Sequence, residues 1–256
     1  AYLVAVFHRS SLAVAGLAAA DRFDITAAQL STFVMLQLLV YAGMQIPVGL
    51  LVDRFGPRRV MLVGSVILTF AQAGFAFADS FATALTARAF VGVGDAMTFV
   101  CLLRLVNSWF AVRAIAQVTL ITGPVGQLGA VFAAAPMTFA LASFGWTTAY
   151  LISAAIGGVV TVLVMLFVHD EPGTKSVRGP AMSWSRIRTS LTASWSQPGT
   201  RLGFWVHFTT QFSATVLGLL WGFPFFVESE HASAEFAGVL LSVMVGTMAS
   251  IMSSTI

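Results

Sequence analysis

Residues 49–59 read Gly49-Leu50-Leu51-Val52-Asp53-Arg54-Phe55-Gly56-Pro57-Arg58-Arg59, and the arrangement of the whole chain follows from them. This stretch places four charges and a glycine turn between two apolar runs, 30–52 and 60–78. Each run matches the ~20 residues that an apolar helix needs to cross the hydrocarbon core of a bilayer. We therefore expect two membrane-spanning helices joined by a tight basic hairpin at a membrane surface.

The composition excludes a soluble globular domain. Of the 256 residues, 58% are hydrophobic and only 9% are charged, which is too little polar surface to cover a soluble protein of this size. The net charge is +3, but the basic residues are spread over short gaps between apolar runs. Membrane lipids are therefore the expected neighbours, and nucleic acid is not. The single cysteine, Cys101, excludes an intramolecular disulfide.

The apolar runs predict an all-α polytopic membrane protein with seven spans and the beginning of an eighth. The expected spans are 1–20, 27–51, 60–78, 81–106, 114–141, 147–168, 201–227 and 236 onward. The chain starts and stops inside apolar runs, so it reads as a fragment.

A single long polar stretch divides the chain. We expect a six-helix transmembrane bundle at 1–168, a linker at 169–200 and the first helices of a second, truncated bundle at 201–256. Within the linker, apolar side chains recur at helical spacing beside arginines, which indicates a short helix on the membrane surface. These side chains are Trp184, Ile187, Leu191 and Trp195.

The distribution of basic residues predicts the orientation. Of the 13 Lys and Arg residues, nine lie in or beside the gaps after the second, fourth and sixth spans, and one, Arg22, lies in the opposite gaps. Cytoplasmic loops carry the excess of Lys and Arg, so residues 49–59 and the linker are expected in the cytoplasm. The expected location is the cell membrane.

Residues 49–59 resemble the signature loop of the major facilitator superfamily of secondary transporters, which has the pattern G-x-L-x-D-R-x-G-x-R-R. A loop shaped only by the preference for positive charge inside would explain the arginines but not the spacing of Gly and Asp. The resemblance implies a fold of two six-helix bundles, of which about seven and a half helices are present here. It also implies a gating latch that pairs with the opposite bundle. The latch residues are Gly49, Asp53, Arg54, Gly56, Arg58 and Arg59.

Two charged residues fall near the middle of the membrane. Arg9 lies eleven residues before the end of the first span, about 16 Å along a helix. Asp95 lies fourteen residues after the start of the fourth span, about 21 Å by the same rise. A charge at this depth costs roughly 2.5–3.5 kcal/mol on insertion scales, so each needs a partner, a water-filled cavity or a function. Both could face one cavity.

The neighbourhoods of these two charges resemble the anion:cation symporter branch, which includes hexuronate, D-galactonate and sialic-acid transporters. Phe7-His8-Arg9-Ser10-Ser11-Leu12-Ala13-Val14-Ala15 resembles its first-helix D-R-x-x-L-S-x-A pattern, and Arg88 to Asp95 resembles its R-x-x-x-G-x-x-E pattern. The resemblance implies proton-coupled uptake of an organic anion, with Arg9 on the substrate carboxylate. Asp95 would carry the proton, together with Arg88 and His8. His8 replaces an aspartate of the branch, and Asp95 replaces a glutamate.

The chemistry of these side chains agrees with that assignment and leaves one alternative open. Arginine is always charged and offers a planar fork of donors that fits a carboxylate. Arg88 and Asp95 are seven residues apart, about 10.5 Å on nearly one helix face, so we expect cavity neighbours rather than a tight pair. The alternative is a structural network that ties helices together without moving a proton.

Two polar stripes give weaker signals. The second span carries Gln37, Tyr41 and Gln45 on one face, and the seventh carries Gln211, Thr215, Gly218 and Gly222. Such residues bond helices together more often than they bind ligands, and of the two stripes only Tyr41 and Gln211 are assigned to the substrate site.

The combined prediction is a monomeric secondary active transporter that works by alternating access and carries a small organic anion with protons. One alternative is a proton-coupled efflux antiporter for drugs or hydrophobic compounds, because residues 123–129 partly resemble its fifth-helix motif. Another is a transporter-like sensor that binds without moving its ligand. Enzyme motifs for metal hydrolysis, nucleophile elbows and phosphate cradles are missing, so no enzyme, cofactor or metal site is expected. The sequence does not name the solute.

Overall fold

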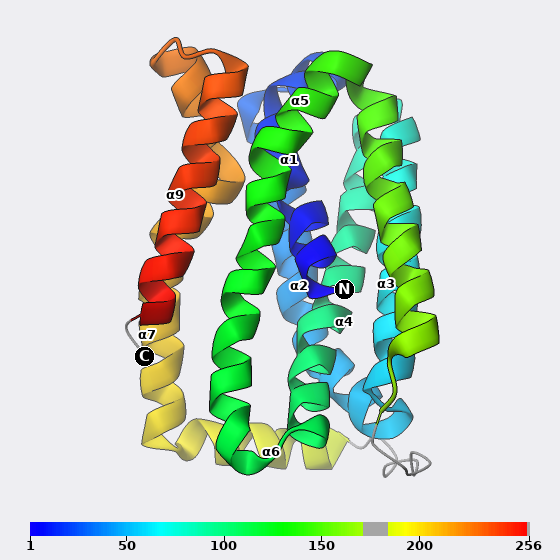
Figure 1. Cartoon of the computed structure of the whole chain (residues 1–256), viewed down its shortest axis with the longest axis vertical. Helices are drawn as coiled ribbons and strands as arrows, with labels where there is room; N and C mark the ends of the chain where they lie inside the picture. Colours follow the sequence, from blue (N-terminus) through cyan, green and yellow to red (C-terminus); the bar gives the residue numbers. More distant parts are fainter. Residues whose placement is uncertain (171–183, 255–256) are drawn as a thin grey trace.

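A computed structural model describes residues 1–170 and 184–254, and every regular element in these ranges is a helix (Figure 1). The elements are α1 (Tyr2–Phe23), α2 (Ala27–Phe55), α3 (Pro57–Phe77), α4 (Phe81–Trp109), α5 (Val112–Phe167), α6 (Trp184–Ser196), α7 (Pro198–Thr215), η1 (Val216–Trp221), α8 (Gly222–Pro224), η2 (Phe225–Ser229) and α9 (Ala234–Ser254). This confirms the predicted all-α polytopic fold. We call the end of the bundle with residues 55–59 the loop side, and the other end the far side.

The long helix α5 contains two of the expected spans. Gly145 has non-helical angles, φ 73° and ψ 176°, and divides α5 into the arms 112–144 and 146–167. The two arms run in opposite directions and meet at the top of the bundle (Figure 1). They correspond to the expected fifth and sixth spans. With α1 to α4, which are each long and apolar enough to cross a membrane, they make six spans before residue 170.

The chain after residue 184 begins with α6, which crosses the bottom of the bundle (Figure 1). It lies where the surface helix is expected, whereas residues 171–183 of the expected linker fall outside the described part of the chain. The segments α7 to η2 cover the expected seventh span, and α9 covers the beginning of the expected eighth. Within them, Val216–Ser229 and Ala234–Met244 are shorter apolar stretches. The division into bundles at residues 168 and 200 stays a prediction.

Helix α1 occupies the middle of the first six spans. It packs between α4 and both arms of α5, and half or more of its surface is buried along the spanning window. Many of its residues are small, including Ala5, Ser11 and Ala15, which lets neighbouring backbones come close. The polar side chains His8, Ser10 and Ser11 of α1 are buried in the bundle, where each needs a partner.

The turn between α2 and α3 is tied to the end of α5. The backbone N–H of Arg58 donates to Asp170 Oδ1 at 2.6 Å, and Arg58 Nη2 donates to the carbonyl of Met165 at 2.8 Å. Gly56 has φ 83° and ψ 154°, a region that only glycine adopts without strain. A Cβ at this position would lie 2.7 Å from Asp170 Oδ2.

The segments from α7 onward contact the first six spans along α5 and on the far side. Along α5, Ser242 of α9 accepts a hydrogen bond from the backbone N–H of Ala135 at 3.2 Å. On the far side, η1 and α8 pack against α1. The segments η1 and η2 are π-helices: the N–H of Gly222 bonds to Leu217 and that of Glu230 to Phe225.

Candidate substrate and proton site

Arg9 of α1 and Asp95 of α4 form an ion pair, with 3.3 Å between Arg9 Nη1 and Asp95 Oδ2. The Asp95 side chain is 1% exposed, whereas the Arg9 side chain is 17% exposed. These are the two residues that the sequence places near the middle of the membrane. The sequence indicates that both could face one cavity, but it does not predict that they form an ion pair. Pairing reduces the cost of holding either charge among apolar helices.

Aromatic rings surround the arginine. Arg9 Cζ lies 5.5 Å from the centre of the Tyr41 ring, a cation–π contact. Tyr2 lies two turns before Arg9 on α1, and its ring is 5.1 Å from that of Phe99 on α4. Sequence reasoning selected Tyr41 but missed Tyr2 and Phe99. Tyr2 precedes Arg9 by seven residues, so helical spacing alone puts both on one face.

Arg88 lies apart from the ion pair and is fully buried. Its guanidinium donates to the carbonyl of His8 at 3.3 Å, to the carbonyl of Arg9 at 2.9 Å and to Gln37 Oε1. Its Cζ is 5.3 Å from the centre of the Phe75 ring. Arg88 makes no direct ion pair with Asp95, as expected of neighbours rather than a tight pair, and its long side chain reaches across to α1 and α2. That the two residues share a cavity stays a prediction.

The side chain of His8 contacts α5, whereas that of Arg9 contacts α2 and α4. Its ring is completely buried, and Nε2 bonds to the carbonyl of Ser153 on α5 at 3.0 Å. Nearby, Gln72 of α3 donates to Ser11 and to Ser153. His8 thus belongs to a polar network between α1, α3 and α5, while Arg9 faces α2 and α4. Its expected part in proton coupling stays a prediction.

The other predicted site residues are dispersed. Gln211 lies in α7, but its side chain falls outside the described part of the structure. Within the latch, Asp53 and Arg59 are exposed, Gly49 lies in the last turns of α2, and Arg54 packs over its own neighbour Phe55 at 5.3 Å. The long-range hydrogen bonds described for this turn go to Asp170 and to Met165 at the end of α5. The role of the latch in gating stays a prediction.

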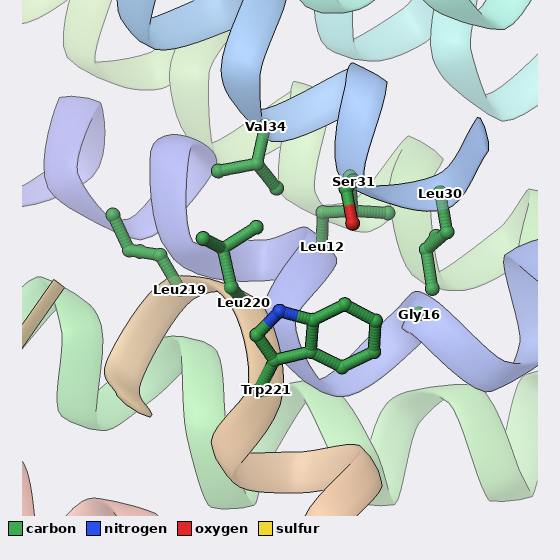
Figure 2. A pocket seen from close by; sticks show the side chains of 8 residues that line it. All are labelled: Leu12, Gly16, Leu30, Ser31, Val34, Leu219, Leu220 and Trp221. Atoms are coloured by element: carbon green, nitrogen blue, oxygen red, sulfur yellow. The ribbon is translucent and has the colours of Figure 1, made fainter. Parts of the chain in front are cut away.

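A narrow contact between the two halves lies on the far side of the bundle. Figure 2 shows Trp221, Leu219 and Leu220 of η1 facing side chains of α1 and α2. The cavity between them has a volume of about 10 Å³, roughly the least that could hold one water molecule. Helices α1 and α2 therefore meet η1 here without room for a solute.

A larger apolar cavity of about 300 Å³ lies between α1 and the two arms of α5. Its lining includes Phe7, Met137 and Ile152. Neither Arg9 nor Asp95 lines this cavity or the far-side one. Arg9 is the partly exposed member of the ion pair.

These features define a polytopic helical membrane protein with a buried ion pair between its first and fourth helices. The chain matches the Major Facilitator Superfamily over residues 1–256, and it belongs to that superfamily. This confirms the family predicted from residues 49–59.

Two curated relatives and one solved structure are similar to the chain. It is 27% identical to the probable sulfoacetate transporter of Cupriavidus necator, over 68% of the chain and 41% of that protein. It is 24% identical to the hexuronate transporter of Bacillus subtilis, again over 68% of the chain and 41% of that protein. The crystal structure of a bacterial homologue of the human lysosomal transporter Spinster matches with a TM-score of 0.75 and 18% identity, over 96% of the chain and 57% of that structure.

The chain thus spans less than half the length of these two curated relatives. Their names agree with the anion:cation symporter branch that the sequence resembles. The match to the solved structure supports the fold alone.

Proposed function

We propose that this protein is a proton-coupled symporter of small organic anions that works by alternating access. The observation that carries the proposal is the ion pair between Arg9 and Asp95 at 3.3 Å. It places a guanidinium suited to binding an anion beside a carboxylate that can take up a proton, inside the membrane-spanning part. The relatives named for sulfoacetate and hexuronate, both small organic anions, support the substrate class.

The geometry couples the two ligands through competition for one arginine. When Asp95 is ionised, it holds the guanidinium of Arg9. When Asp95 binds a proton, its attraction for Arg9 falls, and the guanidinium can bind the substrate carboxylate or sulfonate bidentately. Arg9 is the more exposed partner, so the anion can approach it while Asp95 stays covered. Proton and anion are then bound together and released together.

The test is Asp95→Asn in the full-length protein, reconstituted in proteoliposomes with a screen of sugar acids and sulfonates. Asparagine keeps the size of the side chain but cannot carry a proton. Uptake driven by a pH gradient should disappear, whereas exchange of labelled for unlabelled substrate should continue because it needs no net proton movement. Counterflow in the unchanged protein separates a carrier from a sensor that only binds.

Two outcomes would contradict the proposal. If Asp95→Asn accumulates substrate along a pH gradient as well as the unchanged protein does, Asp95 carries no proton. If exchange and driven uptake fall together and the variant is less stable, the pair is a structural bond, because breaking a buried pair leaves an uncompensated charge that costs about 3–5 kcal/mol.

A further inference from the structure

Arg88 is a buried cation that makes no direct ion pair within the described part of the chain. The close ion pair of this region joins Arg9, not Arg88, to Asp95, although Asp95 is near enough to interact electrostatically with Arg88. A buried charge is costly unless it is paired and hydrogen-bonded, so the hydrogen-bond acceptors around Arg88 supply its direct contacts. Those acceptors are two backbone carbonyls of α1 and one side-chain amide of α2.

The position of these acceptors is specific. The two carbonyls belong to His8 and Arg9, the residues that carry the predicted substrate and proton groups. Each carbonyl oxygen has a second lone pair, so it can accept from Arg88 as well as from the helix itself. The carbonyl of His8 also accepts from the Ser11 hydroxyl at 2.9 Å. Helices α1 and α4 therefore meet at the backbone of His8 and Arg9.

The third acceptor is held by close packing of α2 on α4. A Cβ at Gly92 would lie 2.5 Å from the carbonyl of Gln37, so only glycine allows the two backbones to come this close. Gly92 is one turn after Arg88 on α4. The close approach brings the amide of Gln37, which is 1% exposed, onto the guanidinium of Arg88.

We propose that Arg88, with Gln37, is a positioning residue that fixes the backbone of Arg9 against α4, so that the Arg9 guanidinium stays within reach of Asp95 and of the substrate anion. Arg88 and Asp95 stand on the same helix, so one rigid element sets both the anchor and the ion-pair partner. Only the transport measurements in the test below depend on the proposed function. The inference gives Arg88 the role of positioning Arg9, whereas the sequence resemblance implies a part in proton coupling.

The test compares Arg88→Gln, Arg88→Lys and Gln37→Leu in the full-length protein. Hydrogen exchange followed by mass spectrometry reports on α1, where the amides of Leu12 and Ala13 bond to the carbonyls of His8 and Arg9 in a regular helix. Two variants serve as matched controls. Arg104→Gln removes an exposed arginine from α4, and Gln45→Leu removes an amide of α2 that donates to the carbonyl of Tyr41 in its own helix.

We expect Arg88→Gln and Gln37→Leu to speed amide exchange in residues 8–15 several-fold over the controls, with α5 peptides unchanged. Arg88→Lys should resemble Arg88→Gln, because an ammonium cannot reproduce a fork that reaches three acceptors. In uptake of a sugar acid, KM should rise about tenfold, as for the loss of one charged hydrogen bond. The number of protons moved per anion should stay the same. If Arg88→Gln does not insert, Gln37→Leu carries the same test.

Exchange in α1 equal to that of the controls would overturn the proposal, whatever the transport results. A fall in protons moved per anion at unchanged KM would overturn it too, and would assign Arg88 to coupling. Because the exchange readout needs no substrate, failure of the proposed function leaves it intact. A protein that carries no anion but shows faster exchange in α1 would refute symport and support the positioning role.

Discussion

Arg9 and Arg88 show how differently two arginines of one membrane protein can be compensated. Arg9 is partly exposed and faces a carboxylate and a tyrosine ring; under the proposed function, its donors exchange Asp95 for the substrate anion. Arg88 is fully buried and its described bonds go mainly to backbone carbonyls, which cannot leave. The guanidinium of Arg9, with a side-chain partner, is therefore suited to ligand binding, whereas that of Arg88, bonded to backbone carbonyls, is suited to a structural role.

Arg9→Lys tests whether the geometry of the fork matters. Lysine keeps the charge but presents a point-like ammonium. We expect the apparent affinity for every transported anion to fall nearly as far as in Arg9→Ala, by more than about tenfold, as for the loss of one charged hydrogen bond. Competition binding in detergent measures this. Near-normal affinity in the lysine variant would show that Arg9 supplies charge only, or that it does not touch the anion.

The sequence predicts which charges lie at mid-depth but not which charges meet. Depth follows from counting residues along an apolar run, and this placed Arg9 and Asp95 at similar levels. Partner choice depends on how each helix is rotated and how far a long side chain reaches across the bundle. Spacing on α4 predicts that Arg88 is a neighbour of Asp95 and not its close partner, but it does not predict that Arg88 bonds to α1 and α2. The hydropathy pattern does not indicate which neighbouring helix a long side chain such as that of Arg88 contacts.

At the scale of elements, the turn between α2 and α3 is clasped by the end of α5. Asp170 Oδ1 accepts the N–H of Arg58 in the first turn of α3, so it acts as an N-terminal cap supplied by a distant segment. Residues 49–59 identified this turn because its glycine and charges have fixed spacing. Its partner Asp170 lies 112 positions along the chain and could not be predicted from that spacing.

Two variants test the clasp. Gly56→Ala should destabilise the protein by ~1–3 kcal/mol, because alanine is strained at φ 83° and its Cβ would meet Asp170. Asp170→Ala should cost about 1 kcal/mol through the lost cap. Thermal unfolding of the full-length protein in detergent measures both effects. Asp21→Ala, at an exposed position, is the control, and equal melting temperatures for all three variants would show that the clasp contributes nothing.

The spans themselves are the best predicted part of the structure. Their lengths follow from the thickness of the bilayer, so apolar runs locate helices to within a few residues. The kink at Gly145 falls between two expected spans, as a polytopic chain requires. The π-helices η1 and η2 were not foreseen, because a shift in hydrogen-bond partner leaves the apolar pattern unchanged.

Across the whole molecule, the two halves meet on the far side, where Trp221 and its neighbours pack against α1 and α2 (Figure 2). Under the proposed alternating access, this contact would separate and form again during the transport cycle. The cavity at the contact, about 10 Å³, is too small to hold a solute. The far-side contact is therefore the part of the structure whose state should change with substrate and pH.

Ser31→Cys reports on this change, since Ser31 lines the contact and is half-buried. The natural Cys101 is buried, so background labelling is low. A membrane-impermeant thiol reagent added on the far side should label Cys at position 31 at rates that change several-fold with substrate and pH. Ala28→Cys, exposed in the first turn of α2, should react at one constant rate. Equal and constant rates at both positions would contradict opening on this side.

The wide turn of η1 also sets the angular phase of everything that follows it. In an α-helix each residue advances the chain by about 100°, so one residue more or fewer rotates all later side chains by that amount. The bond from Gly222 to Leu217 accommodates one extra residue without lengthening the helix by a full step. Trp221, the last residue of η1, faces α1 and α2 (Figure 2), and one residue more or fewer before it would rotate its side chain by about 100°. The far-side contact thus depends on the number of residues in η1. We expect the protein to tolerate substitutions in η1 better than an insertion or deletion in that segment.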